Sequence, residues 1–141
     1  MNYLLDTCFL SELRKPIPDG GVVTWIAEID EHRLFVSVLT FGEIQKGITK
    51  LEDGRRKSSL QHWLEGELIQ RFEGRILPID LDAVLEWGLL SAIAERTGKP
   101  APVIDTLLAS TAINQNLTLV TRNQKDFAPY PVKTLNPWSG E

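Results

Sequence analysis

The segment Leu117-Thr118-Leu119-Val120-Thr121 is the clearest predicted strand in the sequence. Its apolar and β-branched residues follow one another without a break, as in a buried strand. Two further short segments have the same character, Tyr3-Leu4-Leu5 and Leu34-Phe35-Val36-Ser37-Val38. Stretches with the helical spacing of apolar side chains separate all three. Strands that alternate with helices predict an α/β layer sandwich with a mainly parallel sheet.

The helices are predicted from apolar residues three or four positions apart. Gly54 and Gly98 close two of them, and Pro102 suits the first turn of the last. We expect helices over residues 7–14, 22–31, 40–53, 55–72 and 82–97, and from Pro102 to about Asn114. Proline-containing or short apolar segments predict edge strands over residues 75–79 and 132–135, which gives a sheet of four to five strands.

Length and composition indicate one ordinary globular domain over residues 1–141. Hydrophobic residues make up 43% and charged residues 24%, and no apolar run approaches the roughly 20 residues that cross a bilayer. The sequence starts without a basic segment and soon reaches Asp6, so we expect no signal peptide. The single cysteine, Cys8, cannot form an internal disulfide, and we therefore expect a cytoplasmic protein.

The formal net charge of −4 at first argues against a nucleic-acid partner, because phosphate groups are usually bound by a basic face. Four acids that hold cations would account for this whole net charge. The remaining chain would be near neutral and would keep local basic groups at Arg14-Lys15, Lys46, Lys50, Arg55-Arg56-Lys57, Arg71 and Arg75. The acidic sum therefore does not exclude RNA or another polyanion.

Four acidic residues are candidates for a site, and each also has a structural explanation. Asp6 follows the first strand and can cap the next helix. Glu43 ends the segment Thr40-Phe41-Gly42-Glu43, which matches a capping box. Asp105 lies in the first turn of its helix, where the helix dipole stabilises a carboxylate. Asp126 can order a turn. Taken singly, none of the four indicates a site.

Their combination favours a metal site. Asp6 and the segment Arg122-Asn123-Gln124-Lys125-Asp126 follow two different strands, and parallel strands bring their carboxyl ends to the same edge of a sheet. Mg²⁺ binds through a few carboxylates, keeps several waters and takes phosphate oxygens as further ligands. The pattern therefore indicates a possible site for metal-dependent phosphotransfer.

Other kinds of site are less well supported. Cys8, His32 and His62 are scattered without the spacing of zinc ligands. A cysteine nucleophile with a histidine base stays open, although both histidines lie in predicted helices that are rich in charge. The glycines lack the companions of a phosphate-binding loop.

The chain resembles a known family in motifs that span nearly its whole length. They are Leu4-Leu5-Asp6-Thr7-Cys8-Phe9-Leu10-Ser11-Glu12-Leu13, Ser37-Val38-Leu39-Thr40-Phe41-Gly42-Glu43 with Gly47, Gly98-Lys99-Pro100 before Asp105-Thr106-Leu107-Leu108-Ala109, Thr121-Arg122-Asn123-Gln124-Lys125-Asp126-Phe127, and Asn136-Pro137-Trp138. In this order and spacing they are similar to PIN-domain ribonucleases of the VapC toxin type, from bacterial toxin–antitoxin pairs.

The resemblance implies a three-layer α/β/α sandwich and an endoribonuclease that hydrolyses RNA with Mg²⁺, for which Mn²⁺ can substitute. By position, Asp6 and Asp105 correspond to the metal ligands and Glu43 to another acid of the catalytic set. Asn123 or Asp126 would complete that set. The residues expected to support the acids with their hydroxyl groups are Thr7, Ser11 and Thr121.

The resemblance also implies partners, namely an RNA substrate, a cognate antitoxin whose C-terminal segment lies over the active site, and a second copy in a homodimer. One residue departs from the family, in which asparagine is common at the position of Cys8. A thiol holds a neighbouring carboxylate less well than an amide does. Two alternatives therefore stay open: a catalytically silent PIN-like module that binds RNA or protein, and a metal-dependent phosphatase acting on a small substrate.

Overall fold

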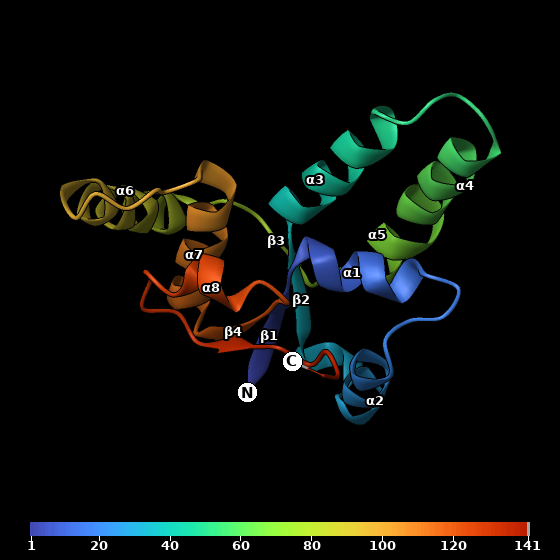
Figure 1. Ribbon diagram of the computed structural model, residues 1–141, viewed down its shortest axis with the longest axis horizontal. Helices are drawn as coiled ribbons and strands as arrows, with labels where there is room; N and C mark the ends of the chain where they lie inside the picture. The colour runs from blue at the N-terminus through green and yellow to red at the C-terminus, as the bar shows by residue number, and fades with distance from the viewer. Residues whose placement is uncertain (141) are drawn as a thin grey trace.

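The computed structural model describes residues 1–140 and contains a five-stranded sheet whose strands all run parallel, in the order β3-β2-β1-β4-β5 (Figure 1). The strands are β1 (Asn2–Leu5), β2 (Leu34–Ser37), β3 (Ile76–Leu77), β4 (Leu117–Val120) and β5 (Thr134–Leu135). The expected parallel sheet is confirmed, and β3 and β5 form its two edges with two residues each.

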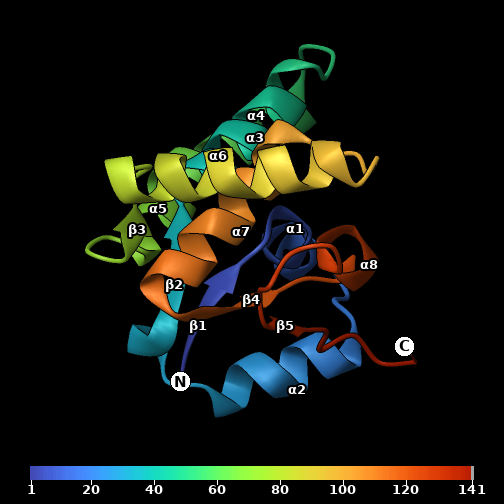
Figure 2. The same ribbon diagram turned by 90° about the vertical axis from the view of Figure 1, so that its left-hand side faces the viewer.

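Helices cover both faces of the sheet and make the three expected layers (Figure 1), and Figure 2 views the molecule from the side of α6 and α7. On one side lie α1 (Thr7–Arg14), α2 (Gly20–Glu28), α3 (Val38–Thr49), α4 (Arg55–Trp63) and α5 (Ile69–Arg71). The other side carries α6 (Leu81–Arg96), α7 (Val103–Gln115) and α8 (Gln124–Phe127). Two irregular helical segments complete the chain, the 3₁₀ helix η1 (Glu31–Arg33) and the π-helical η2 (Leu64–Leu68).

The side chains of β1 alternate between two hydrophobic cores, as the two-residue period of a strand requires. Tyr3 and Leu5 belong to a core shared with α1, α2 and α3. Leu4 belongs to the opposite core, where it joins Leu108 and Ala109 of α7. β1 is thus buried on both faces, and packing on both sides fixes its position in the sheet.

The pairing of β1 with β4 brings Asp6 close to Thr121. Leu5 lies opposite Val120 in the parallel register, and the N–H of Asp6 donates to the carbonyl of Val120 at 3.0 Å. Asp6 and Thr121 are the first residues after their strands. The carboxyl ends of two neighbouring strands therefore meet at one edge, as predicted.

Two helices begin earlier than the sequence pattern suggested, because the residue that caps each of them lies further upstream. α3 was expected to begin at Thr40, but the Ser37 hydroxyl accepts the N–H of Leu39 at 3.1 Å and starts the helix at Val38. α2 begins at Gly20 rather than residue 22, with Asp19 as its cap, and ends at Glu28.

The stretch expected as one helix over residues 55–72 is divided into α4, η2 and α5. Leu64 and Leu68 remain buried across the π-helical turn, so the predicted apolar stripe still faces the core. α8 was not predicted, because four residues are too few to carry a helical period. Its stability comes from Phe127, which is buried in the core beside α7.

The outer face of α6 carries an exposed aliphatic stripe. Leu81, Leu85, Leu89 and Ile93 are 71%, 61%, 62% and 49% exposed and follow one another at intervals of four residues. We refer to these four residues as the α6 stripe. Across residues 1–140, none of the helices combines the length and the apolar character needed to cross a membrane.

Candidate active site

Asp6 is firmly anchored in the candidate site. It is 8% exposed and caps α1, with Oδ1 accepting the N–H of Thr7 at 2.7 Å. Its Oδ2 accepts the hydroxyl of Thr121 at 2.8 Å, and the oxygen of that hydroxyl accepts the N–H of Asn123 at 3.1 Å. The carboxylate therefore has a fixed orientation, while Oδ1 keeps a second lone pair for another ligand.

Glu43 is tied to α1 rather than to the start of its own helix. The Thr7 hydroxyl donates to Oε1 of Glu43 at 2.8 Å. The expected capping box of Thr40 and Glu43 is wrong, because α3 begins at Val38 and Glu43 lies beyond its first turn. Thr40 is fully buried inside the helix, and its hydroxyl has no hydrogen-bond partner within residues 1–140. The structural explanation that competed with a site role for Glu43 is thus removed.

Asp105 lies in the first turn of α7, as expected, and is half-buried. Burial raises the pKa of the Asp105 carboxyl, and the negative charges of Asp6, Asp126 and Glu43 raise this pKa further. Four acids from separate parts of the chain therefore share one electrostatic neighbourhood, and their repulsion is felt most clearly at Asp105.

The structure distinguishes the two residues that were expected to complete the set. Asn123 is exposed and precedes α8, and its backbone rather than its side chain contacts Thr121. Asp126 is an exposed residue of α8 whose charge acts on Asp105. Asn123 thus contacts the hydroxyl that orients Asp6, and Asp126 acts on Asp105 through its charge.

A groove adjoins the acids between α1, α3 and α4. Thr7 and Glu43 line it together with the exposed Ser11, and its volume is about 640 Å³. Apolar residues form much of its wall: Ile44, Ile48, Leu51, Leu60 and Trp63. Arg14, Lys15 and Arg56 add three positive charges. The groove thus has positive charges in its lining and the carboxylate of Glu43 beside the acid cluster.

Cys8 contacts the same acid as Thr121. Its thiol lies 3.5 Å from Oδ2 of Asp6 and 3.7 Å from the Thr121 hydroxyl. Burial, followed by the nearby charge of Asp6, raises the pKa of the thiol to about 11. Cys8 is therefore a neutral thiol near pH 7, which argues against a thiolate nucleophile. His32 and His62 are both exposed.

The acids suit a hard cation by their chemistry, since all offer carboxylate oxygens, and burial and the neighbouring negative charges raise the pKa of Asp105. Within residues 1–140, no three His, Cys, Asp or Glu side chains are gathered closely enough to enclose a metal ion. Mg²⁺ does not need three protein ligands, because it keeps several waters and takes phosphate oxygens as well. Asp6 and Asp105 fit such a site as its two protein ligands.

Comparison with known proteins identifies the family of this chain. Residues 3–132 match the PIN domain family, and the chain belongs to that family. It is 35% identical over 135 residues to the VapC ribonuclease Y4jK of Sinorhizobium fredii and 33% identical over 135 residues to toxin FitB of Neisseria gonorrhoeae. These alignments cover 96% of this chain in both cases, and 96% and 97% of the two relatives.

A solved structure of FitAB bound to a DNA fragment has a similar fold. Its matching chain is 31% identical and superposes with a TM-score of 0.89, covering 99% of this chain and 97% of that one. The three-layer fold expected from the motifs is therefore confirmed over the described residues.

Two features near the site were missed by sequence reasoning. The capping role of Ser37 had a local signal, since serine before an apolar helical stretch is a common cap, but Thr40 gave the same signal. The hydrogen bond from the Trp138 indole to Glu12 had no local signal, because 126 residues separate its partners.

Proposed function

We propose that this PIN-domain protein is a metal-dependent endoribonuclease that acts as the toxin of a toxin–antitoxin pair in the cytoplasm. The observation that carries the proposal is the gathering of four acids at one edge of the sheet: Thr7 contacts both Asp6 and Glu43, and the charges of Asp6, Asp126 and Glu43 act on the half-buried Asp105. The relatives named VapC ribonuclease and toxin FitB support the substrate class and the biological role.

Asp6 and Asp105 would hold Mg²⁺, for which Mn²⁺ can substitute. A bound ion of this kind supplies a Lewis acid for the phosphodiester and a counter-charge for the leaving oxygen. The protein's part is orientation: Thr121 fixes one oxygen of Asp6 by its hydroxyl, and the N–H of Thr7 fixes the other.

Glu43 and Asp126 would complete the catalytic set. The Thr7 hydroxyl occupies Oε1 of Glu43, which leaves Oε2 to accept a hydrogen bond from the attacking water and then its proton. Asp126 would act through its charge on Asp105, and Asn123 through the backbone N–H that holds the Thr121 hydroxyl. Ser11 would contact substrate in the groove that it lines.

The groove between α1, α3 and α4 would receive the partners. Arg14, Lys15 and Arg56 suit the phosphates of an RNA strand that leads to Glu43. The apolar wall suits a segment of the cognate antitoxin, which would then cover the acids. The FitAB structure supports an antitoxin partner, since its name describes a complex bound to DNA.

A homodimer would use the α6 stripe. Four aliphatic side chains at helical spacing can pack against the same stripe of a second copy about a two-fold axis. Size-exclusion chromatography with light scattering would test this state. Leu85→Glu together with Leu89→Glu should give a monomer, whereas an unchanged mass for this variant, or a monomeric parent protein, would contradict the dimer.

A catalytically silent module that binds RNA or protein is the second candidate, and Cys8 is the observation that favours it. The neutral thiol at 3.5 Å holds Asp6 more weakly than a shorter hydrogen bond from an amide would. A site oriented only by Thr121 and the helix cap would turn over more slowly, although its acids are complete.

Three measurements separate the candidates: RNA cleavage, RNA binding and release of phosphate from small esters. The protein is incubated with a fluorogenic RNA in Mg²⁺, in Mn²⁺ and in EDTA, beside the Asp105→Asn variant. Cleavage that needs the metal and Asp105 supports the ribonuclease. Binding of RNA without cleavage supports the silent module, and release of phosphate from small esters in preference to RNA supports a phosphatase.

A further inference from the structure

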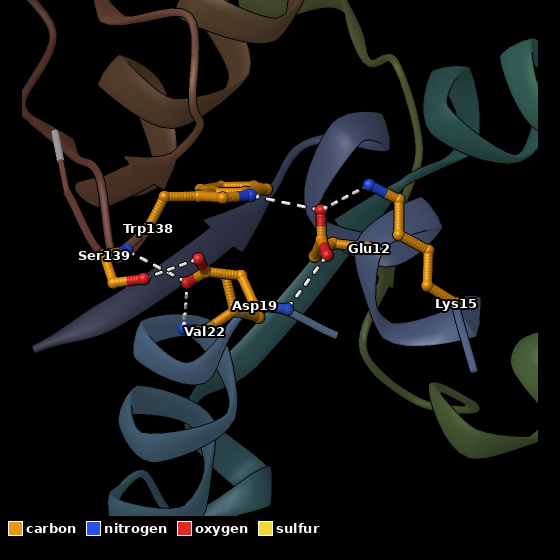
Figure 3. A network of polar contacts seen from close by, with 6 residues as sticks. All are labelled: Glu12, Lys15, Asp19, Val22, Trp138 and Ser139. Atoms are coloured by element: carbon orange, nitrogen blue, oxygen red, sulfur yellow. Dashed lines mark hydrogen bonds and ion pairs between the residues drawn. The ribbon is translucent and has the colours of Figure 1, made fainter. Parts of the chain in front are cut away.

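We propose that Trp138 is a positioning residue for the Asp6 side of the active site, held in place by a clasp that residues 136–139 form with α1 and α2. The inference rests on the proposed ribonuclease function and concerns a segment outside the four acids. Figure 3 shows the polar contacts of this clasp.

The clasp is built around two carboxylates outside the catalytic set. Glu12 of α1 is 6% exposed, and its Oε1 accepts the indole N–H of Trp138 at 3.2 Å and the ammonium of Lys15 at 3.0 Å (Figure 3). Its Oε2 accepts the backbone N–H of Asp19 at 3.0 Å. A buried carboxylate with three donors fixes the groups around it, because moving any of them would leave the charge unsatisfied.

Asp19 holds the far end of the clasp. Its carboxylate caps α2 through the N–H of Val22 at 3.1 Å, and it accepts both the N–H of Ser139 at 2.9 Å and the hydroxyl of Ser139 at 2.6 Å (Figure 3). The chain crosses Gly21 closely, since a Cβ there would meet the carbonyl oxygen of Pro137 at 2.4 Å. The segment is therefore fastened to α2 as well as to α1.

Trp138 connects Glu12 and Asp19 to the loop after β4, residues 121–123. The ring is 5% exposed and packs edge to face against Phe9 of α1, with the ring centroids 6.0 Å apart. The guanidinium of Arg122 lies over the same ring, 5.8 Å from its centroid. Arg122 stands between Thr121, whose hydroxyl orients Asp6, and Asn123, whose N–H holds that hydroxyl.

One ring thus bridges the two segments that orient Asp6. Phe9 lies on the helix that Asp6 caps, and Arg122 lies on the loop that carries Thr121. Loss of the ring would let the loop move relative to α1, and the hydroxyl of Thr121 would shift from Oδ2 of Asp6. Displacement of a group by about 1 Å, even by a change far from the chemistry, can lower a rate by about a hundredfold.

The test compares purified full-length variants well below their melting temperatures. We expect Trp138→Leu to lower kcat for a fluorogenic RNA at least about tenfold with KM nearly unchanged, and to weaken Mn²⁺ binding measured by calorimetry without RNA. Trp138→Phe keeps a ring beside Phe9 and Arg122, and it should retain most of both properties. Arg122→Gln alters only an exposed side chain, so it tests the same bridge if Trp138→Leu fails to fold.

Ser139→Ala is the matched control. It removes one hydrogen bond between the clasp and α2 but leaves the ring contacts of Trp138 intact. Unchanged kcat and Mn²⁺ affinity in this variant, with both lowered in Trp138→Leu or Arg122→Gln, would support positioning. Equal losses in Ser139→Ala, or no loss in the other two, would overturn it. If the parent protein cleaves RNA no faster than Asp105→Asn, the proposed function fails instead.

Discussion

The two halves of the carboxylate cluster are held in opposite ways. Asp6 is buried, and the N–H of Thr7 and the hydroxyl of Thr121 both donate to it. Asp105 is half-buried, and its environment of burial and three negative charges raises its pKa. The first acid is satisfied by the protein itself, whereas the second, under the proposed function, would be satisfied by the bound cation.

This difference separates stability from function. Loss of a hydrogen-bond donor on the Asp6 side should weaken the fold, because a buried charge would lose a partner. Loss of charge on the Asp105 side should relieve repulsion. The four predictions below use this contrast, beginning with the variant that we expect to have the largest effect.

The replacement Asp105→Asn should abolish most RNA cleavage, by at least about a hundredfold, because the charge that holds the cation is gone. The metal-free melting temperature should be equal to or slightly above that of the parent protein, since two charges about 5 Å apart repel by roughly 3 kcal/mol at an effective dielectric of 20, much of it relieved by solvent. Mn²⁺ should raise the melting temperature of the parent protein and no longer raise that of the variant.

Asp82→Asn is the control for this prediction, because Asp82 is an exposed acid in the first turn of α6. It makes the same change in the first turn of another helix, outside the acid cluster. Full activity in Asp105→Asn would show that the comparison between the two halves is mistaken.

Glu43→Gln should lower cleavage by about a hundredfold while changing the free energy of unfolding by less than about 0.5 kcal/mol. The amide oxygen of glutamine can still accept the Thr7 hydroxyl, so the link between α1 and α3 survives. Urea unfolding and a fluorogenic RNA assay on the same preparation measure both quantities, with Glu52→Gln as the exposed control on the following loop. Unaltered cleavage would reduce Glu43 to a structural link.

Thr121→Val should cost about 1–3 kcal/mol of unfolding free energy, because the buried Asp6 and the N–H of Asn123 both lose a partner. Cleavage should fall about tenfold, since Asp6 is retained but less well oriented. Thr118→Val is the matched control, as it makes the same change at a buried position of β4. Equal stability of the two variants in urea would contradict the anchoring of Asp6 by Thr121.

Asp19→Asn should remove a pH-dependent part of the stability of the fold without changing the reaction. The hydroxyl of Ser139, and then its N–H, lower the pKa of Asp19 from 3.8 to about 2. The stabilisation is complete above pH 3.8 and is lost as the pH falls towards 2, because the folded state resists protonation in that interval.

Urea titrations between pH 6 and about 2 should therefore show a shallower acid loss for Asp19→Asn than for the parent protein. RNA cleavage at neutral pH should be unchanged, which marks Asp19 as a satisfied carboxylate without a part in the reaction. If the free energy of unfolding fell equally steeply with pH in both proteins, the Asp19 carboxylate would not be the satisfied group described here.

The sequence predicted those parts of the fold that depend on neighbouring residues. The apolar strands β1, β2 and β4 stand out by their own composition, and Asp6 and Asp105 follow from their places at a strand end and a helix start. The start of α3 could not be decided locally, because Ser37 and Thr40 are both good caps. The Ser37 hydroxyl is the one that accepts a helix N–H, from Leu39, and which hydroxyl does so depends on the assembled fold.

Contacts between distant segments account for what the sequence did not predict. The Thr7 hydroxyl reaches Glu43 across 36 residues, and the Trp138 indole reaches Glu12 across 126. Thr7 and Thr121 were expected to support the acids, but which acid each hydroxyl reaches was not, because no local period records which helix will lie beside which loop.

The short edges of the sheet have a consequence for how the protein behaves when crowded. β3 and β5 expose only two residues of backbone each at the sheet's margins. A long, flat margin offers unpaired N–H and carbonyl groups on which a strand of another molecule can grow, and this is a common start of fibre formation. Newly made copies of this chain therefore offer one another few unpaired backbone groups. Their association then depends on side-chain surfaces, whose fit can be selective.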